Sequence, residues 1–260
     1  MTNDTVMKGD YALIYLKPGK TWLIKVDGDS DIHTHAGYIN GNEILNKEYG
    51  SNVTSNTGRE FVILRPTMAD FLMKSSRPTQ IVYPKDLGAI AVWVDFSPGK
   101  VVVEAGTGSG TITCLAANLV RPGGHVYSYE IRDDFVKAAM KNISKTGLSD
   151  YISLIHKDAR EGIDQKNADI AIVDVGDPWT LIEPMKNSLR GAGMLVSISP
   201  TINQVEKVTI ELVRQGFVEI ESIELMLRRM EAREGKSRPS MRMIGHTAYL
   251  TFARKVLDKS

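Results

Sequence analysis

The sequence predicts an α/β protein in which a doubly wound, mostly parallel sheet follows a small β unit. Two observations support this fold class. From residue 100 onward, short apolar runs alternate with segments of helical pattern, which is the order of strands joined by helices. The runs VVVEAG (101–106) and IAIVDV (170–175) are apolar on both faces, as expected for parallel strands that helices cover.

Residues 9–65 have a different pattern, in which apolar and polar positions alternate in short bursts. The bursts YALIYL, TWLIKV and EFVIL are separated by turn-forming segments rich in Gly, Asn, Ser and Thr, which indicates a small antiparallel β unit. Residues 66–97 look helical or irregular. The expected division is a small N-terminal β domain at 1–65, a helical linker segment at 66–99 and a second domain at 100–260.

Strand-like and helical segments follow one another through the second domain. Strands are expected at 100–106, 125–131, 152–158, 170–175, 193–200, 217–225 and 246–255, and helices at 109–120, 132–147, 181–191 and 202–216. The last two strands have no helix between them, so one of them should run antiparallel. We therefore expect five βα units and a terminal hairpin, in a sheet with one reversed strand.

The composition indicates where the protein is located and which kinds of site it can contain. Hydrophobic residues at 42% and charged residues at 24% are ordinary values for a globular protein, and no apolar run is long enough to span a bilayer. The start MTNDTVMKGD lacks the layout of a signal peptide, so we expect a cytoplasmic protein. The single cysteine, Cys114, excludes an internal disulfide and argues against a cysteine-based metal site.

Charge is concentrated in one place, although the net charge of the chain is only +1. Residues 226–246 hold six basic side chains against the two acidic ones of Glu231 and Glu234. Such a cluster suggests a surface that faces phosphate groups, while a solvated loop is the alternative. The basic residues are Arg228, Arg229, Arg233, Lys236, Arg238 and Arg242.

The segment VVVEAGTGSGTIT (101–113) carries the strongest chemical signal. A strand runs into Glu104, three glycines follow, and a helix begins. Glycines let a ligand approach the backbone, and a helix N-terminus offers N–H groups to an anion. The spacing is G-x-G-x-G, which matches neither the dinucleotide fingerprint nor a P-loop.

Two further acids stand at the expected ends of strands, where open α/β sheets bind ligands. Glu130 follows Gly106 by 24 residues, a spacing typical of a carboxylate that accepts hydrogen bonds from ribose hydroxyls. Asp158 could accept from an adenine amino group. Capping of the following helical turn is the alternative for both residues. A ligand with ribose, adenine and a charged amino-acid part suggests S-adenosylmethionine.

The segments EAGTGSG, SYEIRDDF, KDAREG and DVGDPW, in this order, resemble the motifs of class I methyltransferases. Their fold is a Rossmann-like sheet of seven strands, mostly parallel with one antiparallel. More narrowly, the chain resembles the tRNA (adenine-58-N1)-methyltransferase family in its prokaryotic single-subunit form. DIHTHAGYI (31–39), RPTMADFLMKSSRPTQIVYPKD (65–86) and IGHTAYL (244–250) extend the resemblance over nearly the whole chain.

The resemblance implies a methyl transfer from S-adenosylmethionine to N1 of a T-loop adenine in tRNA, at position 58 and in some members also at 57. It implies a homotetramer and no metal. Asp174 matches the catalytic aspartate and Tyr83 an aromatic residue of the active site. The implied cofactor-binding residues are Glu104, Gly106, Gly108, Ser109, Gly110, Thr111, Ile112, Glu130, Asp158 and Asp174.

The stretch IVDVGDPW (172–179) contains two candidates for the carboxylate that meets the base. Asp174 matches the family position, whereas DPW is also similar to the base-binding segment of DNA amino-methyltransferases, which would favour Asp177. We favour Asp174, with Asp177 and Trp179 shaping the pocket. Tyr83 and Trp179 are candidates to hold a flipped adenine, and core packing is the alternative for Trp179.

The remaining substrate-binding candidates are cationic. Arg228, Arg229, Arg233, Arg238 and Arg242 are expected to hold tRNA phosphates, and Lys85 could do the same. His35 and His246 are interpreted as hydrogen-bonded structural or tRNA-facing residues rather than general bases. Two other functions compete: a class I methyltransferase acting on another acceptor, such as protein isoaspartate, and a non-catalytic tRNA-binding subunit.

Overall fold

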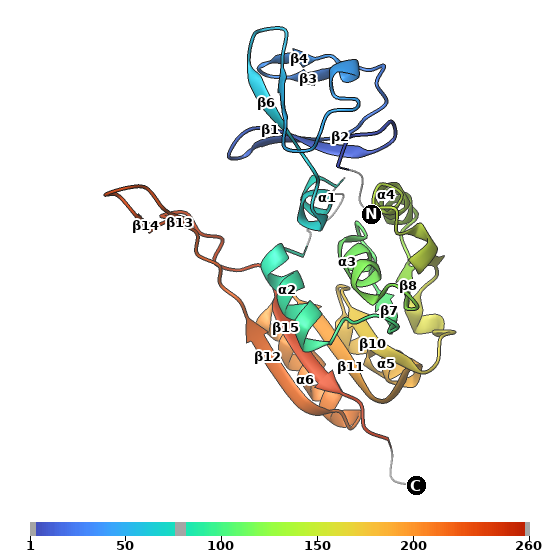
Figure 1. Ribbon diagram of the computed structural model, residues 1–260. Coiled ribbons are helices and arrows are strands. Elements are labelled where there is room, and N and C mark those ends of the chain that lie inside the picture. The colour runs from blue at the N-terminus through green and yellow to red at the C-terminus, as the bar shows by residue number, and fades with distance from the viewer. Residues whose placement is uncertain (1–3, 76–81, 258–260) are drawn as a thin grey trace. The chain divides into compact units, whose positions relative to one another are not determined.

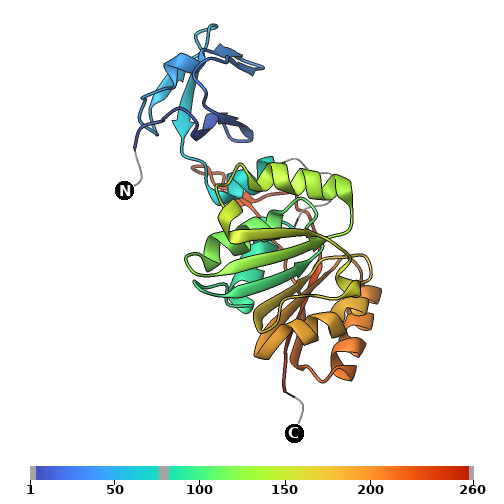
Figure 2. The same ribbon diagram turned by 90° about the vertical axis from the view of Figure 1, so that its right-hand side faces the viewer.

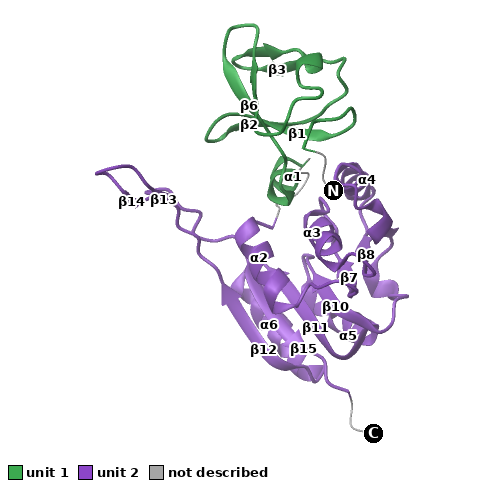
Figure 3. Ribbon diagram, in the orientation of Figure 1, with its two compact units in different colours: residues 1–75 green, residues 76–260 purple. Residues whose placement is uncertain are grey.

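The computed structural model describes residues 4–75 and 82–257. The chain forms two compact units, residues 1–75 and 76–260 (Figure 3). The stretch 76–81, which belongs to the family-like segment 65–86, lies outside the described residues.

Unit 1 is the small antiparallel β structure that the sequence predicts. Four strands pair in the order β2-β1-β6-β5, and a separate ribbon consists of β3 and β4. The bounds are β1 Tyr11–Lys17, β2 Lys20–Lys25, β3 Ile32–Thr34, β4 Gly37–Ile39, β5 Asn52–Thr54, β6 Glu60–Leu64, the 3₁₀ turn η1 Gly41–Glu43 and α1 Met68–Lys74. Alternate side chains such as Ala12, Ile14, Phe61 and Ile63 point inward and form the core of this unit.

Unit 2 contains the seven-stranded sheet, in the order β12-β15-β11-β10-β7-β8-β9 (Figure 1). Neighbours from β11 to β9 pair in parallel, and β15 is antiparallel to both β11 and β12. The predicted reversed strand is therefore confirmed as β15. The strands are β7 Val101–Ala105, β8 His125–Glu130, β9 Ile152–His156, β10 Ala168–Val173, β11 Leu189–Ser199, β12 Val218–Glu224 and β15 Tyr249–Arg254.

Helices cover both faces of this sheet, so its central strands are buried (Figure 2). α2 and α3 contact each other, and α5 and α6 do so on the opposite face, where α6 packs on β11, β12 and β15. The bounds are α2 Pro84–Trp93, α3 Thr111–Val120, α4 Asp133–Ile143, α5 Ile182–Ser188 and α6 Ile202–Arg214. In the described residues, no helix is long and apolar enough to cross a membrane.

Two details of the sequence prediction are wrong. The expected count of five βα units is too high, because in the described residues only four strands of this sheet are followed by an α-helix, and β9 leads to β10 through the short turn η3 (Ala159–Glu161). The helix expected to reach Gly191 ends at Ser188, since Leu189 has extended φ and ψ and begins the eleven-residue strand β11. Neither change moves a strand end that bears a candidate residue.

Candidate active site at the carboxyl end of the sheet

The turn after β7 brings two strand ends into direct contact. Gly106 has φ +93°, donates its N–H to the carbonyl of Tyr129 at 2.9 Å, and lies against Asp174. A Cβ at this position would stand 2.0 Å from the Asp174 carbonyl oxygen. Only glycine therefore fits between β7 and the end of β10.

Glu104 is fully buried beneath this turn. Its Oε2 accepts hydrogen bonds from Thr113 Oγ1 at 2.5 Å and Ser128 Oγ at 2.6 Å. Within the described residues its Oε1 has no partner. Burial raises the pKa of Glu104 to about 8, and the nearby charges of Asp174 and Glu130 act in the same direction.

Glu130 lies at the end of β8 and is almost fully buried. Its Oε1 accepts from the backbone N–H groups of Ile131 at 2.9 Å and Arg132 at 3.0 Å, and its Oε2 accepts from Gly108 at 3.0 Å. This carboxylate therefore fixes the glycine turn and also caps the turn before α4. A carboxylate has about four lone-pair sites, so Oε2 retains capacity for one more donor.

Asp158 and Asp177 share one cation, Arg160. The guanidinium binds both Asp158 oxygens at 3.1 Å, contacts Asp177 Oδ1, and donates from Nε to Thr180 at 3.1 Å. Asp158 also caps η3 by accepting from the Arg160 N–H at 2.9 Å. Asp158 therefore caps the following turn, as the alternative reading expected, and it also lines the cleft. The Asp177 carboxylate is already bound by Arg160.

Asp174 contrasts with Asp177, although only two residues separate them. Its backbone N–H donates to Ala105 at 2.9 Å, which holds the residue at the strand end. Among the residues that the structure describes, none makes a hydrogen bond to its carboxylate. Burial raises the pKa of Asp174 to about 7, and the charge of Glu130 contributes to the rise.

A cleft at this sheet edge collects most of the predicted acids. Its lining includes Gly106, Glu130, Asp158 and Asp177, together with Lys157 and Arg160. Ser109 and Gly110 lie just before α3, and Thr111 and Ile112 are its first two residues. All four are buried, and Asn142 of α4 donates to the Ser109 carbonyl at 3.0 Å. These four residues do not line the cleft itself.

Trp179 packs against the core beneath α6, and the Nζ of Lys207 lies 4.2 Å from its ring centroid. A cation thus covers one face of the ring, an arrangement worth roughly 0.5–1 kcal/mol at an accessible site. The placement favours the packing alternative for Trp179 over stacking on a base. Stacking would need the opposite face of the ring.

Tyr83 is partly buried and precedes α2, with extended backbone angles (φ −77°, ψ 155°). It is not among the residues that line the cleft. The nearby Lys85 is only 9% exposed in its side chain and binds Asp86 and Thr247. The expectation that Lys85 holds a tRNA phosphate is therefore wrong.

The basic segment forms a projecting arm, which we define as residues 225–245 (Figure 1). Its tip pairs β13 (Met230–Glu231) with β14 (Arg238–Pro239), and its five arginines are exposed. Arg238 pairs with Glu231 at 3.0 Å, and Arg228 donates to the Ser240 carbonyl at 3.3 Å. The arm also exposes apolar side chains that the charge pattern did not reveal: Met226, Leu227, Met230, Met241, Met243 and Ile244.

Sequence reasoning missed Arg160 as an organiser of the cleft, although KDAREG contains it two residues after Asp158. The position of an arginine just after an acidic residue at a strand end could have indicated this role. It also missed Thr113 and Ser128, whose hydroxyl groups hold Glu104. In the described part of the chain, no group of three or more His, Cys, Asp or Glu side chains could hold a metal ion.

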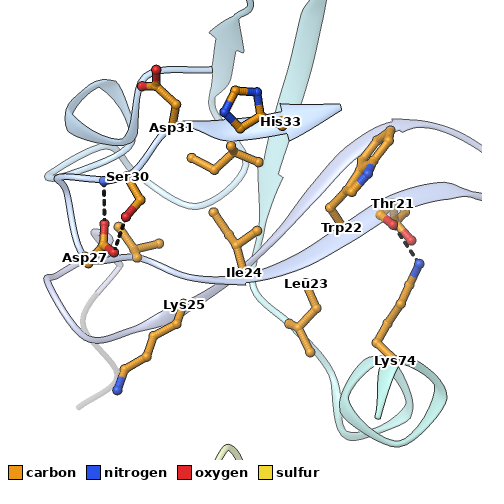
Figure 4. A pocket seen from close by; sticks show the side chains of 12 residues that line it. Thr21, Trp22, Leu23, Ile24, Lys25, Asp27, Ser30, Asp31, His33 and Lys74 are labelled. Carbon is orange, nitrogen blue, oxygen red and sulfur yellow. Dashed lines mark hydrogen bonds between the residues drawn. The ribbon is translucent and has the colours of Figure 1, made fainter. Parts of the chain in front are cut away.

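A larger hollow, of about 550 Å³, lies in unit 1 between β2 and the β2–β3 connection (Figure 4). Lys25 and Lys74 face it, but so do Asp27 and Asp31, and the Nζ of Lys74 is bound to the Thr21 carbonyl at 2.6 Å. The sheet-edge cleft is smaller, about 130 Å³. It nevertheless contains Gly106 of the glycine turn and the side chains of Glu130, Asp158 and Asp177 at three strand ends, so a ligand is better placed there. Glu104 and Asp174, whose pKa values are raised, do not line this cleft.

Known proteins resemble the chain over almost its whole length. A family model described as the tRNA methyltransferase complex GCD14 subunit matches residues 60–239. The chain is 34% identical to the tRNA (adenine(57)-N(1)/adenine(58)-N(1))-methyltransferase TrmI of Methanocaldococcus jannaschii, over 94% of each chain. It is 29% identical to the tRNA (adenine(58)-N(1))-methyltransferase TrmI of Thermus thermophilus, covering 92% of this chain and 94% of the relative.

Solved structures agree in fold. A SAM-dependent O-methyltransferase from Thermotoga maritima superposes with a TM-score of 0.93 at 35% identity, covering 99% of this chain and 97% of that one. The tRNA (m1A58) methyltransferase TrmI from Aquifex aeolicus gives a TM-score of 0.85 at 29% identity, covering 98% of this chain and 100% of that one. The predicted Rossmann-like methyltransferase fold is thereby confirmed.

Proposed function

This chain belongs to the tRNA methyltransferase family of the GCD14 subunit, and we propose that it transfers a methyl group from S-adenosylmethionine to N1 of a T-loop adenine in tRNA. Position 58 is the proposed acceptor. The Methanocaldococcus relative carries 57 and 58 in its name, whereas the Thermus and Aquifex proteins carry 58 alone, so position 57 belongs in every test.

The observation that carries this proposal is the state of Asp174. Its carboxylate has no partner within the described residues, and it stands at the strand end against Gly106, while Asp177 is held by Arg160. A free carboxylate at this edge can accept a hydrogen bond from the N6 amino group of adenine. It also stabilises the positive charge that develops on the ring as N1 is methylated.

The residues at the edge fit S-adenosylmethionine, which when bound supplies an electrophilic methyl group on sulfur. Because Gly106 has no Cβ, the turn packs directly against the Asp174 carbonyl, and its backbone lines the cleft where a ligand can approach it. The open acceptor on Glu130 Oε2 suits a ribose hydroxyl, and the unpaired Oε1 of buried Glu104 suits the amino-acid ammonium group. Asp158, at the third strand end, is proposed to face the adenine side.

The base itself must leave its stack before Asp174 can reach it. We propose that Tyr83 provides a face for the flipped adenine and that Asp177 shapes the pocket through its bond to Arg160. Trp179 has one face covered by Lys207, so any contact with the base would use its edge or other face. The exposed arginines of the arm are proposed to hold tRNA phosphates.

The direct test is methyl transfer to an unmodified tRNA transcript followed by nucleoside mapping. We expect 1-methyladenosine in the T-loop, and none at position 58 when guanine replaces the adenine there. An O-methylated product would instead favour the activity named for the Thermotoga structure. Absence of S-adenosylmethionine binding in calorimetry would contradict the enzyme and favour a non-catalytic tRNA-binding subunit.

The pH dependence of kcat/KM offers a second test, because Asp174 must be ionised to act as an acceptor. Its pKa of about 7 predicts that kcat/KM rises with pH through about pH 7 and then levels off. The Asp174→Asn enzyme, which cannot ionise there, should lack this rise in its residual activity. A wild-type profile that is flat from about pH 6 to about pH 8 would contradict the assignment.

Assembly and location are proposals of the same kind. We propose a cytoplasmic homotetramer, and the six exposed apolar side chains of the arm support self-association, because patches of this kind commonly mark protein contacts. The molar mass measured by light scattering on a size-exclusion column tests the tetramer. A monomer at working concentrations would contradict it.

A further inference from the structure

A closed network of three polar side chains, one completely buried and two partly buried, lies next to Tyr83 in the chain. The Nζ of Lys85 donates to Asp86 Oδ1 at 2.7 Å and to Thr247 Oγ1 at 2.6 Å, while Thr247 Oγ1 donates to Asp86 Oδ2 at 2.8 Å. Asp86 is completely buried. Two members belong to the first turn of α2, and the third precedes β15, some 160 residues later in the chain.

His246, the neighbour of Thr247, makes a second set of long-range bonds. Its Nδ1 lies 2.6 Å from Glu224 Oε1, and its Nε2 lies 2.9 Å from the Pro200 carbonyl oxygen. Both partners are acceptors, so the two contacts are both hydrogen bonds when the ring is protonated on both nitrogens, which is the imidazolium form. In agreement with this, the hydrogen bond to Glu224, together with the one to Pro200, raises the pKa of His246 from its ordinary value.

These bonds join four segments at one edge of the sheet. Glu224 ends β12 and Pro200 follows β11, while the arm leaves the sheet after Glu224 and returns at His246 (Figure 1). His246 therefore closes the base of the arm, and Thr247 fastens that base to the turn that begins with Tyr83. The Tyr83 carbonyl accepts from the N–H groups of Asp86 and Leu87 at 2.9 Å, so the backbone at Tyr83 is fixed through the same turn.

We infer that His246 and Thr247 act as a bracket that positions Tyr83, and with it the base of the basic arm, for methyl transfer. This inference rests on the proposed function. His246 and Thr247 are positioning residues, since they act through Lys85, Asp86 and Glu224.

The chemistry of the bracket supports positioning over mere stability. A buried ion pair contributes little net stability compared with well-packed apolar side chains, whereas its directional bonds fix one arrangement. Lys85, Asp86 and Thr247 satisfy one another with three short bonds, so rotation of the first turn of α2 breaks at least two of them. A shift of about 1 Å in a positioning group can lower a rate by up to ~10²-fold.

The experiment compares Thr247→Val with Thr247→Ser. Valine keeps the shape but removes both hydroxyl bonds, and serine keeps the hydroxyl group. We expect Thr247→Val to lower kcat for tRNA methylation by about 10-fold while the Kd for S-adenosylmethionine stays within about twofold. Thr247→Ser should restore kcat to near the wild-type value. A wild-type kcat in Thr247→Val, or an equal loss in both variants, would overturn the inference.

A second readout does not depend on activity. Fluorotyrosine introduced at position 83 should give a ¹⁹F resonance that shifts in Thr247→Val and returns in Thr247→Ser. If the wild-type enzyme methylates no tRNA, the proposed function fails. The bracket is tested separately, because an unchanged ¹⁹F spectrum in Thr247→Val would refute it whatever the activity. A second variant, Glu224→Gln, tests the bracket if Thr247→Val does not fold. This substitution at an exposed position weakens the hydrogen bond to His246 but leaves the bonds among Lys85, Asp86 and Thr247 in place. It should shift the same resonance less, and no shift would count against the bracket.

Discussion

Replacing Asp174 with alanine is expected to lower kcat for methyl transfer by on the order of 10²-fold or more, the usual effect of removing a preorganised electrostatic group. The physical reason is that the substitution removes the carboxylate that orients the N6 amino group and faces the developing positive charge. Single-turnover methylation of a tRNA transcript measures this effect. Binding of S-adenosylmethionine, followed by calorimetry, should change far less than the rate.

The matched control is Asp177→Ala, three residues further along the same segment. Asp177 is bound to Arg160, so its removal frees that guanidinium but leaves Asp174 in place. We expect a loss of rate within about 10-fold, because Arg160 keeps its bonds to Asp158 and Thr180. A near-normal rate in Asp174→Ala together with an inactive Asp177→Ala would show that the base meets Asp177 instead.

This choice between two aspartates shows where sequence reasoning ended. Alternating apolar runs predicted β10 and placed both acids at its end, because a buried strand must deliver its next residues to the sheet edge. The partner that occupies Asp177 lies 17 residues earlier, after another strand. No local pattern predicts which of two neighbouring carboxylates an arginine from a different strand end will bind.

Similar limits explain the other differences. The glycine turn was predictable because strand, glycines and helix are contiguous, and the structure gives Gly106 a contact that only glycine allows. Lys85 was expected to hold a tRNA phosphate, but its side chain is only 9% exposed. Its burial depends on Thr247, which reaches α2 only through the antiparallel return of β15. The cation over the ring of Trp179 likewise comes from a distant residue, Lys207 of α6.

Glu130→Ala is expected to raise the Kd for S-adenosylmethionine by about 10²-fold. Each hydrogen bond to a charged group contributes about 1.5–3 kcal/mol, and each 1.4 kcal/mol is a factor of about ten in affinity. Alanine removes the ribose acceptor and leaves the Gly108, Ile131 and Arg132 N–H groups without this acceptor, so the glycine turn loses its support. Calorimetry without tRNA measures the effect directly.

Asp133→Ala provides the control, because Asp133 opens the helix after the same strand but is exposed and pairs only with Lys137 among the described residues. Its Kd should match wild type. Glu130→Ala has a second consequence that a general loss of structure would not produce: the Glu130 charge raises the pKa of Asp174, so its removal should lower that pKa. At saturating cofactor, the rise of rate with pH should therefore move to lower pH. An unchanged Kd would refute the ribose role. An unmoved pH profile would mean that the charge of Glu130 does not act on Asp174.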